Sequence, residues 1–220
     1  MITLHHLNNS RSQRVLWLLE ELEIPYGLER YQRDPKTMLA PEALRAIHPL
    51  GKAPIITDEG HTVAETGAIV EYILSRHGGG RMIPPAGSDD HLAYTYWLHF
   101  AEGSAMPPLV MDIVLQEMPK RITPLIRPLA KLIGQGMRKG YLKPMIDSHL
   151  DLMETTLTGG GWFAGAALTA ADVMMSFPVE AAAARVGLGS RRALAAWLAK
   201  IHARPAFTRA LEKGGPYAYA

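Results

Sequence analysis

Apolar residues in the first part of the chain follow two spacings that alternate along the sequence. Short extended runs occupy 2–6 and 26–31. Between them, Val15, Leu18 and Leu22 recur at the spacing of one face of a helix. The pattern therefore predicts strand, helix and strand, with the helix spanning 11–22.

The same alternation continues to residue 80. Residues 41–47 predict a short helix, and runs at 53–57 and 61–64 flank a turn and predict a hairpin. A third helical pattern, marked by Ile69, Val70, Ile73 and Leu74, ends at three consecutive glycines, 78–80. The complete order is βαβαββα, which is an α/β arrangement with a small mixed sheet.

Beyond this point the strand pattern is absent. Residues 78–90 are rich in glycine and proline, which is typical of a linker. Helices are predicted at about 91–118, 121–139, 144–157, 170–186, 191–202 and 206–212. We therefore expect an α/β domain over 1–80 and an all-α domain over 90–220.

Composition places the chain among folded proteins. Hydrophobic residues make up 48% and charged residues 20% of the 220 positions, which excludes a disordered chain. No run of about 18 apolar residues predicts a membrane helix, and the first ten residues lack the features of a secretory signal. The absence of cysteine excludes disulfides and a catalytic cysteine and fits a cytoplasmic protein.

Charge is distributed unevenly. Residues 120–143 contain seven cations and no acid, which could attract nucleic acid or an anionic surface. A solvated helix face that borders a site for anionic ligands is the simpler interpretation, because no aromatic interleaving or binding motif accompanies the charge. We expect neither a nucleic-acid nor a membrane partner. The nine histidines include no pair with the spacing of a helical metal site, so we expect no metal.

Three stretches join a loop or strand to the next element and could carry chemistry. The first precedes the helix at 11–22, where Ser10 and Gln13 have the spacing of a capping box. A hydroxyl at a helix N-terminus can also donate to an anion, supported by free N–H groups and the helix dipole. Spacing alone favours the cap.

The other two stretches surround the hairpin. If the Ala53–Pro54 bond in the run 48–54 is cis, the backbone of Ala53 is turned outward and can pair with an extended ligand. Glu65 and Thr66 open the third helix, where Thr66 could be its N-cap.

Together these stretches resemble the glutathione transferase superfamily over nearly the whole chain. Residues 10–22 read SRSQRVLWLLEEL and resemble its serine-type branch, similar to fungal and bacterial transferases near the theta class. Residues 48–54, HPLGKAP, resemble the Asn-Pro-x-Gly-Lys-Val-Pro loop, whose proline is cis, and Glu65-Thr66 matches a Glu-Ser pair. Residues 168–172, LTAAD, resemble the buried capping box of the second domain. The resemblance implies a thioredoxin-like domain followed by an all-helical one.

The resemblance also implies a role for each residue of a glutathione site. Lys52 would pair with the glycyl carboxylate, and the backbone of Ala53 would hold the cysteinyl unit. Glu65 and Thr66 would hold the γ-glutamyl amine and carboxylate, and Arg11 would lie at the same site. Glutathione is then a co-substrate.

Ser10 would donate a hydrogen bond to the sulfur. A free thiol has a pKa near 8.5, and lowering it by about two units requires roughly 2.7 kcal/mol of preference for the thiolate. One charge-assisted hydrogen bond of roughly 1.5–3 kcal/mol supplies this, with help from the helix dipole. Asn9 and Ser12 flank Ser10 and are alternative partners of the sulfur. Counting back four positions from Arg14 selects Ser10, and counting back five selects Asn9.

The implied reaction is attack of the glutathione thiolate on a small hydrophobic electrophile, in the service of detoxification. Phe100 and Met106 lie on the first long helix of the second domain and would line the pocket for that electrophile, although such a stripe is more often core. The resemblance implies a homodimer as well. The alternatives are a non-catalytic glutathione-binding or scaffold protein, or a glutathione-dependent isomerase, dehalogenase or peroxidase.

Overall fold

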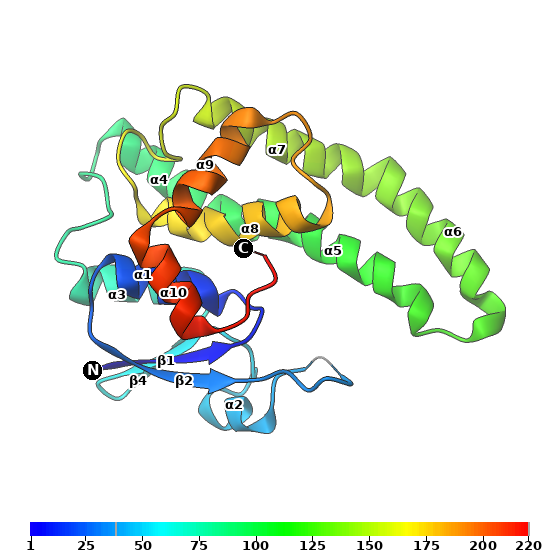
Figure 1. Ribbon diagram of the computed structural model, residues 1–220, viewed down its shortest axis with the longest axis horizontal. Helices are drawn as coiled ribbons and strands as arrows, with labels where there is room; N and C mark the ends of the chain where they lie inside the picture. The colour runs from blue at the N-terminus through cyan, green and yellow to red at the C-terminus, as the bar shows by residue number, and fades with distance from the viewer. Residues whose placement is uncertain (38, 220) are drawn as a thin grey trace.

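The N-terminal part of the chain is a mixed sheet with helices. The computed structural model describes residues 1–37 and 39–219. Its first elements are β1 (Ile2–Leu7), α1 (Ser12–Glu21), β2 (Tyr26–Tyr31), α2 (Glu42–Ile47), β3 (Ile55–Asp58), β4 (His61–Ala64) and α3 (Thr66–His77). The strand order is β2-β1-β3-β4, with β1 parallel to β2 and antiparallel to β3 (Figure 1). The predicted βαβαββα order and thioredoxin-like class are confirmed.

The rest of the described chain is helical. Its elements are α4 (Asp89–Phe100), α5 (Met106–Glu117), α6 (Arg127–Met137), α7 (Lys143–Leu157), α8 (Ala170–Arg185), α9 (Arg192–His202) and α10 (Pro205–Gly214). The single helix predicted over 91–118 is interrupted by a π-helical turn at Ala101–Ala105, and a second π turn at Arg138–Leu142 links α6 to α7. Hydrophobic spacing did not reveal these turns, because one wider turn barely disturbs a helical period.

Helix α1 lies between the sheet and the helical part. Every residue from Ser12 to Glu20 is buried, because α1 contacts β1, α8 and α10. Helix α8 is buried from Ala170 to Ala182, as expected for a helix that is apolar on all sides. The two helices join both parts of the chain in one continuous hydrophobic core.

A capping box holds the start of α8. Thr169 is the N-cap, and the carboxylate of Asp172 accepts bonds from its backbone N–H at 3.0 Å and its hydroxyl at 3.1 Å. Asp172 also accepts from the backbone N–H of Phe163 at 2.9 Å and from the indole N–H of Trp197 at 3.1 Å. One fully buried carboxylate therefore ties α8 to α9 and to the loop before α8.

The capping box expected of Ser10 and Gln13 is wrong. Arg11 already has helical backbone angles and occupies the N-cap of α1, where no side chain caps the helix. The backbone N–H of Gln13 bonds to the carbonyl of Ser10, at 3.2 Å, and not to its hydroxyl. The hydroxyl of Ser10 accepts instead from the backbone N–H of Ser12, also at 3.2 Å.

The helix cap considered at Thr66 is also not formed. Glu65 is the N-cap of α3, and α3 begins at Thr66 without a side-chain cap. The hydroxyl of Thr66 is therefore available for other partners.

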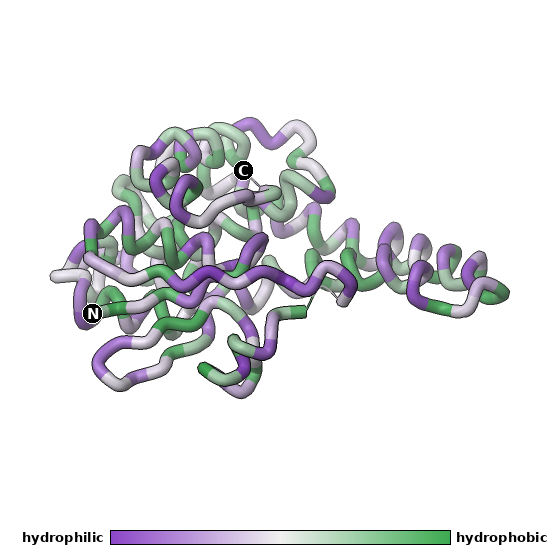
Figure 2. The backbone as a smooth tube through the Cα atoms, turned by 60° about the horizontal axis from the view of Figure 1, so that its bottom comes forward, coloured by the Kyte–Doolittle hydropathy of each residue, from purple (hydrophilic) through white to green (hydrophobic). Residues whose placement is uncertain are grey.

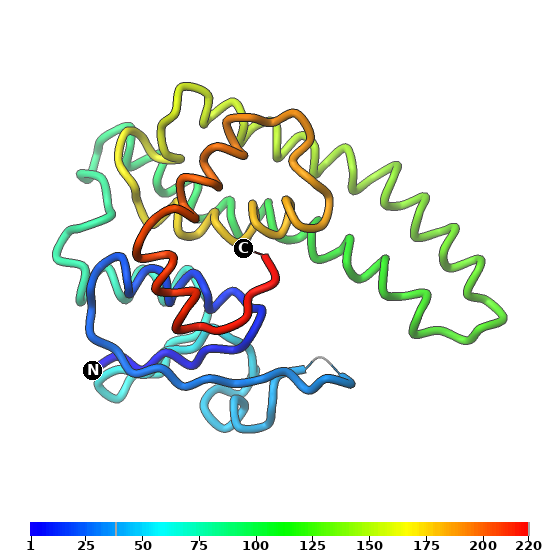
Figure 3. Tube along the Cα trace, in the orientation of Figure 1, coloured from blue at the N-terminus to red at the C-terminus, as the bar shows by residue number. Residues whose placement is uncertain are grey.

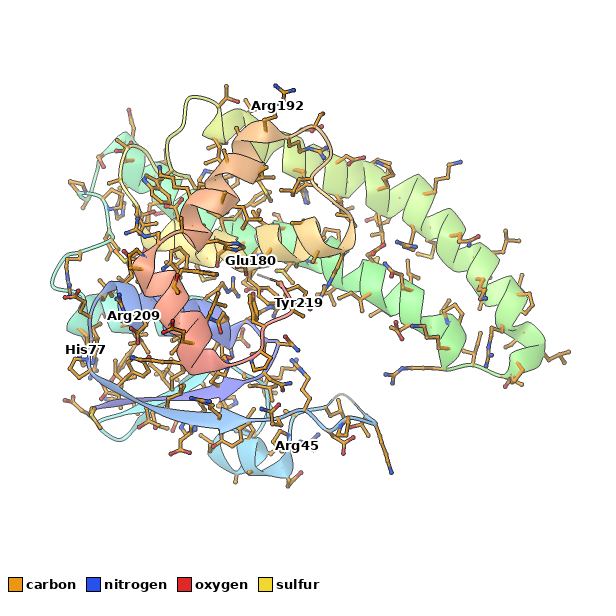
Figure 4. The ribbon with its side chains drawn as sticks, in the orientation of Figure 1. Arg45, His77, Glu180, Arg192, Arg209 and Tyr219 are labelled. Carbon is orange, nitrogen blue, oxygen red and sulfur yellow. The ribbon has the colours of Figure 1, made fainter. Side chains whose placement is uncertain are left out.

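Glu20 attaches α10 to α1. Its carboxylate accepts from Arg209 Nε at 2.9 Å, Lys213 Nζ at 2.5 Å and the hydroxyl of Tyr26 at 2.5 Å. Figure 4 labels Arg209 on α10, the helix that lies against α1. Burial raises the pKa of Glu20, but the three donors outweigh it and hold the pKa below its ordinary value of 4.5.

We expect this attachment to weaken in acid. Because the folded-state pKa is depressed, the contribution of Glu20 to stability is complete above the unfolded pKa and is lost as pH falls through the folded one. Glu20→Gln should lower the free energy of unfolding at neutral pH and flatten its decline below about pH 5. Urea unfolding measured over that range checks this, with Glu23→Gln, an exposed acid without these partners, as the control. An equally steep decline in Glu20→Gln would contradict the prediction.

Helices α5 and α6 form a hairpin that projects from the rest of the molecule (Figures 1 and 2). Figure 2 shows hydrophobic and hydrophilic residues alternating along both arms. No helix among the described residues is long and apolar enough to cross a membrane.

Candidate active site

Five of the residues expected to bind glutathione line a single cavity. The cavity has a volume of about 150 Å³ and lies where the loop before α1, the loop before β3 and the start of α3 meet. The five are Arg11, Lys52, Ala53, Glu65 and Thr66. The remaining wall residues are His48, Leu50, Pro54 and Ala64.

The cavity contains charges of both signs. Arg11 and Lys52 contribute two cations, and Glu65 contributes one carboxylate. Glutathione carries two carboxylates and one ammonium at neutral pH, so the cavity matches it in sign and in number. Within 1–37 and 39–219, neither Lys52 nor Glu65 forms an ion pair with another side chain, and both are available to a ligand.

The backbone of the cavity wall has two unusual features. Glu65 has φ of 71° and ψ of 124°, a conformation that costs a residue other than glycine about 1–3 kcal/mol. Such strain persists where the surrounding structure requires it, often at ligand sites. The Ala53–Pro54 bond is cis, as the resemblance implies. Both segments present their residues to the same cavity.

A π turn brings a further carboxylate to the site. Glu102 lies in the turn Ala101–Ala105, its carboxylate is 3.5 Å from the guanidinium of Arg11, and it also contacts Arg14. Such turns inside α-helices are frequent at functional sites. Glu102 therefore links the helical part of the chain to the cavity wall.

Arg14 lies behind the cavity and is completely buried. It donates to the carbonyl of Met174 at 2.6 Å, to Thr66 Oγ1 at 3.3 Å, and to Glu102. Burial lowers the pKa of Arg14, and Glu102 partly offsets this, so the guanidinium stays charged. Because Thr66 accepts from Arg14, its own hydroxyl hydrogen is free to be donated to a ligand carboxylate.

Ser10 lies one residue before the cavity wall and is only 5% exposed. Its hydroxyl is 2.7 Å from that of Ser12. Ser12 is fully buried, and its oxygen is also within bonding distance of His6 Nδ1, at 2.9 Å, and of the backbone of Leu7. Ser12 is thus enclosed by protein. Ser10 does not line the cavity itself, but it directly precedes Arg11, which does.

Asn9 is held by the C-terminal tail, residues 215–219. It has φ of 48°, and its Oδ1 accepts from the backbone N–H of Ala218 at 2.8 Å. The tail runs back from α10 to α8 (Figure 3), and its Tyr219, labelled in Figure 4, contacts Arg185 of α8. With its oxygen engaged, Asn9 offers its NH₂ group as a donor.

Phe100 and Met106 are part of the hydrophobic core. They are 8% and 3% exposed, and Phe100 packs on the rings of Trp97 and His149. Neither lines the cavity described above, and their expected place on the wall of a co-substrate pocket stays a prediction. Apolar residues at helical spacing pack inward, and this stripe faces the interior of the helical part.

The helical part contains a larger cavity of about 570 Å³ between α5, α7 and the end of α8. Its wall is mostly charged, with Asp112, Arg138, Lys143, Asp147 and Arg185 among its residues. Asp112 pairs with Arg138 at 2.5 Å, and Lys143 pairs with Asp147 at 2.5 Å.

Comparison with known proteins identifies the family. Residues 10–76 match the family model of the glutathione S-transferase N-terminal domain. The chain is 36% identical over 218 residues to glutathione S-transferase 3 of Schizosaccharomyces pombe, which covers 97% of this chain and 88% of that protein. The chain belongs to the glutathione S-transferase family.

Further glutathione S-transferases agree with this assignment. Glutathione S-transferase 1 of Saccharomyces cerevisiae is 30% identical over 97% of this chain and 95% of its own length. A glutathione S-transferase structure from Actinobacillus pleuropneumoniae has 30% identity and a TM-score of 0.81, over 99% of this chain and 94% of that one. A sphingomonad enzyme complexed with glutathione shares the fold, with a TM-score of 0.71 at 22% identity. The family, the fold and the transferase class predicted from the sequence are confirmed.

Sequence reasoning missed Glu102. Its one signal is a single acid among small residues, five positions before the first of two prolines, in a stretch that otherwise has the pattern of core. Arg14 was part of the motif, but its contact with Thr66 and Glu102 depends on tertiary packing.

Proposed function

We propose that the chain conjugates the thiolate of glutathione to small hydrophobic electrophiles. The observation that supports this is one cavity whose charges match those of glutathione. Lys52 pairs with the glycyl carboxylate, and Arg11 adds positive potential beside it. Ala53 pairs through its backbone with the cysteinyl unit, while Glu65 and Thr66 bind the γ-glutamyl ammonium and carboxylate.

Ser10 stabilises the thiolate in this proposal. It lies at the start of α1, where free backbone N–H groups and the helix dipole favour negative charge. The thiolate sulfur attacks the electrophilic carbon and forms the C–S bond, and a leaving group departs with its electron pair. The NH₂ group of Asn9 is the alternative donor, because the tail engages only its oxygen.

Titration of the bound thiol distinguishes the two donors. Ser10→Ala should raise the pKa of bound glutathione by about one unit or more and slow conjugation at neutral pH about tenfold. The ultraviolet absorbance of the thiolate in the binary complex measures this pKa. If Ser10→Ala titrates like the wild type while Asn9→Ala shifts, the donor is Asn9. If neither shifts, Arg11 holds the sulfur.

Affinity and turnover together test the function. Retention on immobilised glutathione with turnover of an aryl halide is the expected result. Retention without turnover, across a panel that includes haloacids and hydroperoxides, would identify a binding protein of the same fold. Turnover of only one other substrate class would identify an isomerase, a dehalogenase or a peroxidase.

We further propose a homodimer in which the first domain of one chain packs on the second domain of its partner. The hairpin exposes many large apolar side chains: Val110, Met111, Val114, Leu125, Ile126, Leu129, Leu132, Ile133 and Met137. Within this part of the chain, residues 120–143 contain seven cations and no acid, whereas residues 1–80 contain ten acids and eight Lys or Arg. Opposite charge favours this pairing.

Sedimentation at micromolar concentration should show a dimer, and a monomer would contradict the proposed homodimer.

The proposed setting is detoxification in the cytoplasm. A conjugating enzyme with a small hydrophobic co-substrate serves that purpose, and a chain without cysteine is compatible with a reducing compartment. Fractionation of cells that express the tagged protein tests the location.

A further inference from the structure

A chain of hydrogen bonds leads from α10 to the sulfur side of the site. His6 on β1 is 3% exposed, and its imidazole bonds to the carbonyl of Gly214 at the end of α10. Its Nδ1 is 2.9 Å from Ser12 Oγ, which is 2.7 Å from Ser10 Oγ. The chain therefore ends at the hydroxyl proposed to meet the thiolate.

The imidazole is fixed in place. A Cβ added to Gly214 would lie 3.4 Å from the ring of His6, an ordinary packing distance, so α10 lies directly against the imidazole. Packed in this way, the ring keeps one nitrogen toward Gly214 and the other toward Ser12.

The protonation state of His6 determines which atom is the donor in its contact with Ser12. Burial lowers the pKa of His6 to about 4, with a further contribution from Arg30, so the ring is neutral at pH 7 and has one N–H. A carbonyl only accepts, so the N–H is directed to Gly214. Nδ1 is then an acceptor, and at 2.9 Å it is closer to Ser12 Oγ than the carbonyl of Leu7 is at 3.2 Å, so the single hydroxyl hydrogen of Ser12 is donated to Nδ1.

The donor in the contact between Ser10 and Ser12 follows from this. Ser12 has no hydrogen left, so in the 2.7 Å contact Ser10 is the donor and Ser12 the acceptor. The backbone N–H of Ser12 occupies one lone pair of Ser10, at 3.2 Å. What Ser10 presents to a ligand is its other lone pair, which accepts from a thiol but does not stabilise a thiolate.

We propose that His6 is a positioning residue that acts through Ser12 to hold the hydroxyl of Ser10 away from the sulfur while the ligand is a thiol. This rests on the proposed role of Ser10. When bound glutathione loses its proton to water, the hydroxyl of Ser10 rotates from Ser12 to the sulfur, and no covalent bond of the protein changes. The bond given up to Ser12 limits how far the thiol pKa falls.

The direction in which one substitution shifts the pKa of bound glutathione tests this proposal. In Ser12→Ala the competing acceptor is gone, so Ser10 should turn fully to the sulfur and the pKa of bound glutathione should fall by about half a unit to one unit. A merely supporting role for Ser12 would raise the pKa or leave it unchanged. Ser10→Ala, measured alongside, should raise it.

His6→Phe examines the same chain one residue further away. It releases the hydrogen of Ser12 to either Ser10 or the carbonyl of Leu7, so the thiol pKa should fall by a smaller amount. His5→Phe is the matched control, because His5 lies next to His6 on the strand but bonds to Tyr31 and Thr57. The control should titrate like the wild type.

The tautomer of His6 can be measured in the wild-type protein, without a variant. Nitrogen-15 chemical shifts of the His6 imidazole should show the N–H on Nε2, and an N–H on Nδ1 would overturn the proposal. A raised or unchanged thiol pKa in both Ser12→Ala and His6→Phe would also overturn it, while a rise in Ser10→Ala would leave the proposed function intact. If Ser10→Ala shifts nothing, the role of Ser10 itself fails.

Discussion

Replacing Asp172 by alanine is expected to lower the free energy of unfolding by about 3–5 kcal/mol. The carboxylate is fully buried and accepts four hydrogen bonds, all at 2.9–3.1 Å. Its removal leaves four donors on Phe163, Thr169 and Trp197 without a partner and out of reach of water. Each buried donor left unpaired costs about 1–3 kcal/mol, reduced by local relaxation.

Urea unfolding monitored by far-ultraviolet circular dichroism measures this loss. Asp151→Ala is the matched control, because Asp151 is also an acid of the helical part, but its side chain is 68% exposed and pairs with the partly exposed Arg191 at 2.8 Å. The control should change the free energy of unfolding by less than about 1 kcal/mol. Similar losses in the two variants would mean that the capping box does not anchor α8.

The parts of the fold that could be predicted from the sequence are those with a strong local signal. Spacing of apolar residues located α1, and glycines marked the end of α3 close to His77, where the helix stops. The π turn at Ala101–Ala105 escaped prediction, because one wider turn leaves the spacing of apolar residues along the helix almost unchanged. The cap at Ser10 was wrong because Arg11 adopts helical angles, which no side-chain pattern reports.

Residues of the site were also predictable where they belong to a local motif and not where they depend on tertiary packing. Lys52 and Glu65 belong to short motifs whose residues lie close to the ligand cavity, so a resemblance of motifs placed them on one wall. Glu102 is remote in sequence and meets Arg11 only through packing of the helical part. The resemblance placed the helix of Phe100 beside a co-substrate pocket, but only tertiary structure shows that the Phe100 side chain is buried in the core.

Glu65→Ala is expected to weaken glutathione affinity roughly ten- to a hundredfold, corresponding to about 1.5–3 kcal/mol. The substitution removes a charge-assisted hydrogen bond to the ligand ammonium, and Glu102, the other carboxylate at the site, is already paired with Arg11 and Arg14. Calorimetry with glutathione measures the loss. Unchanged affinity in a folded variant would remove Glu65 from the site.

Lys52→Ala should also weaken glutathione binding, and the size of this loss should depend more strongly on salt concentration than the loss in Glu65→Ala. Lys52 is exposed on the cavity wall, so its pairing with a carboxylate is screened as ionic strength rises. The difference in affinity between wild type and Lys52→Ala should shrink between low and high salt. A constant difference would indicate that Lys52 acts through the shape of the loop rather than through its charge.

Glu65→Gly separates the binding role of this residue from the strain of its backbone. Glycine adopts a φ near 71° without steric cost, whereas alanine retains the strain. Glu65→Gly should therefore bind glutathione as weakly as Glu65→Ala and yet be more stable than Glu65→Ala by about 1 kcal/mol. Thermal unfolding of both variants without ligand checks the second part. Equal stabilities would mean that the backbone at Glu65 stores no strain, and the loss of affinity would then report the missing carboxylate alone.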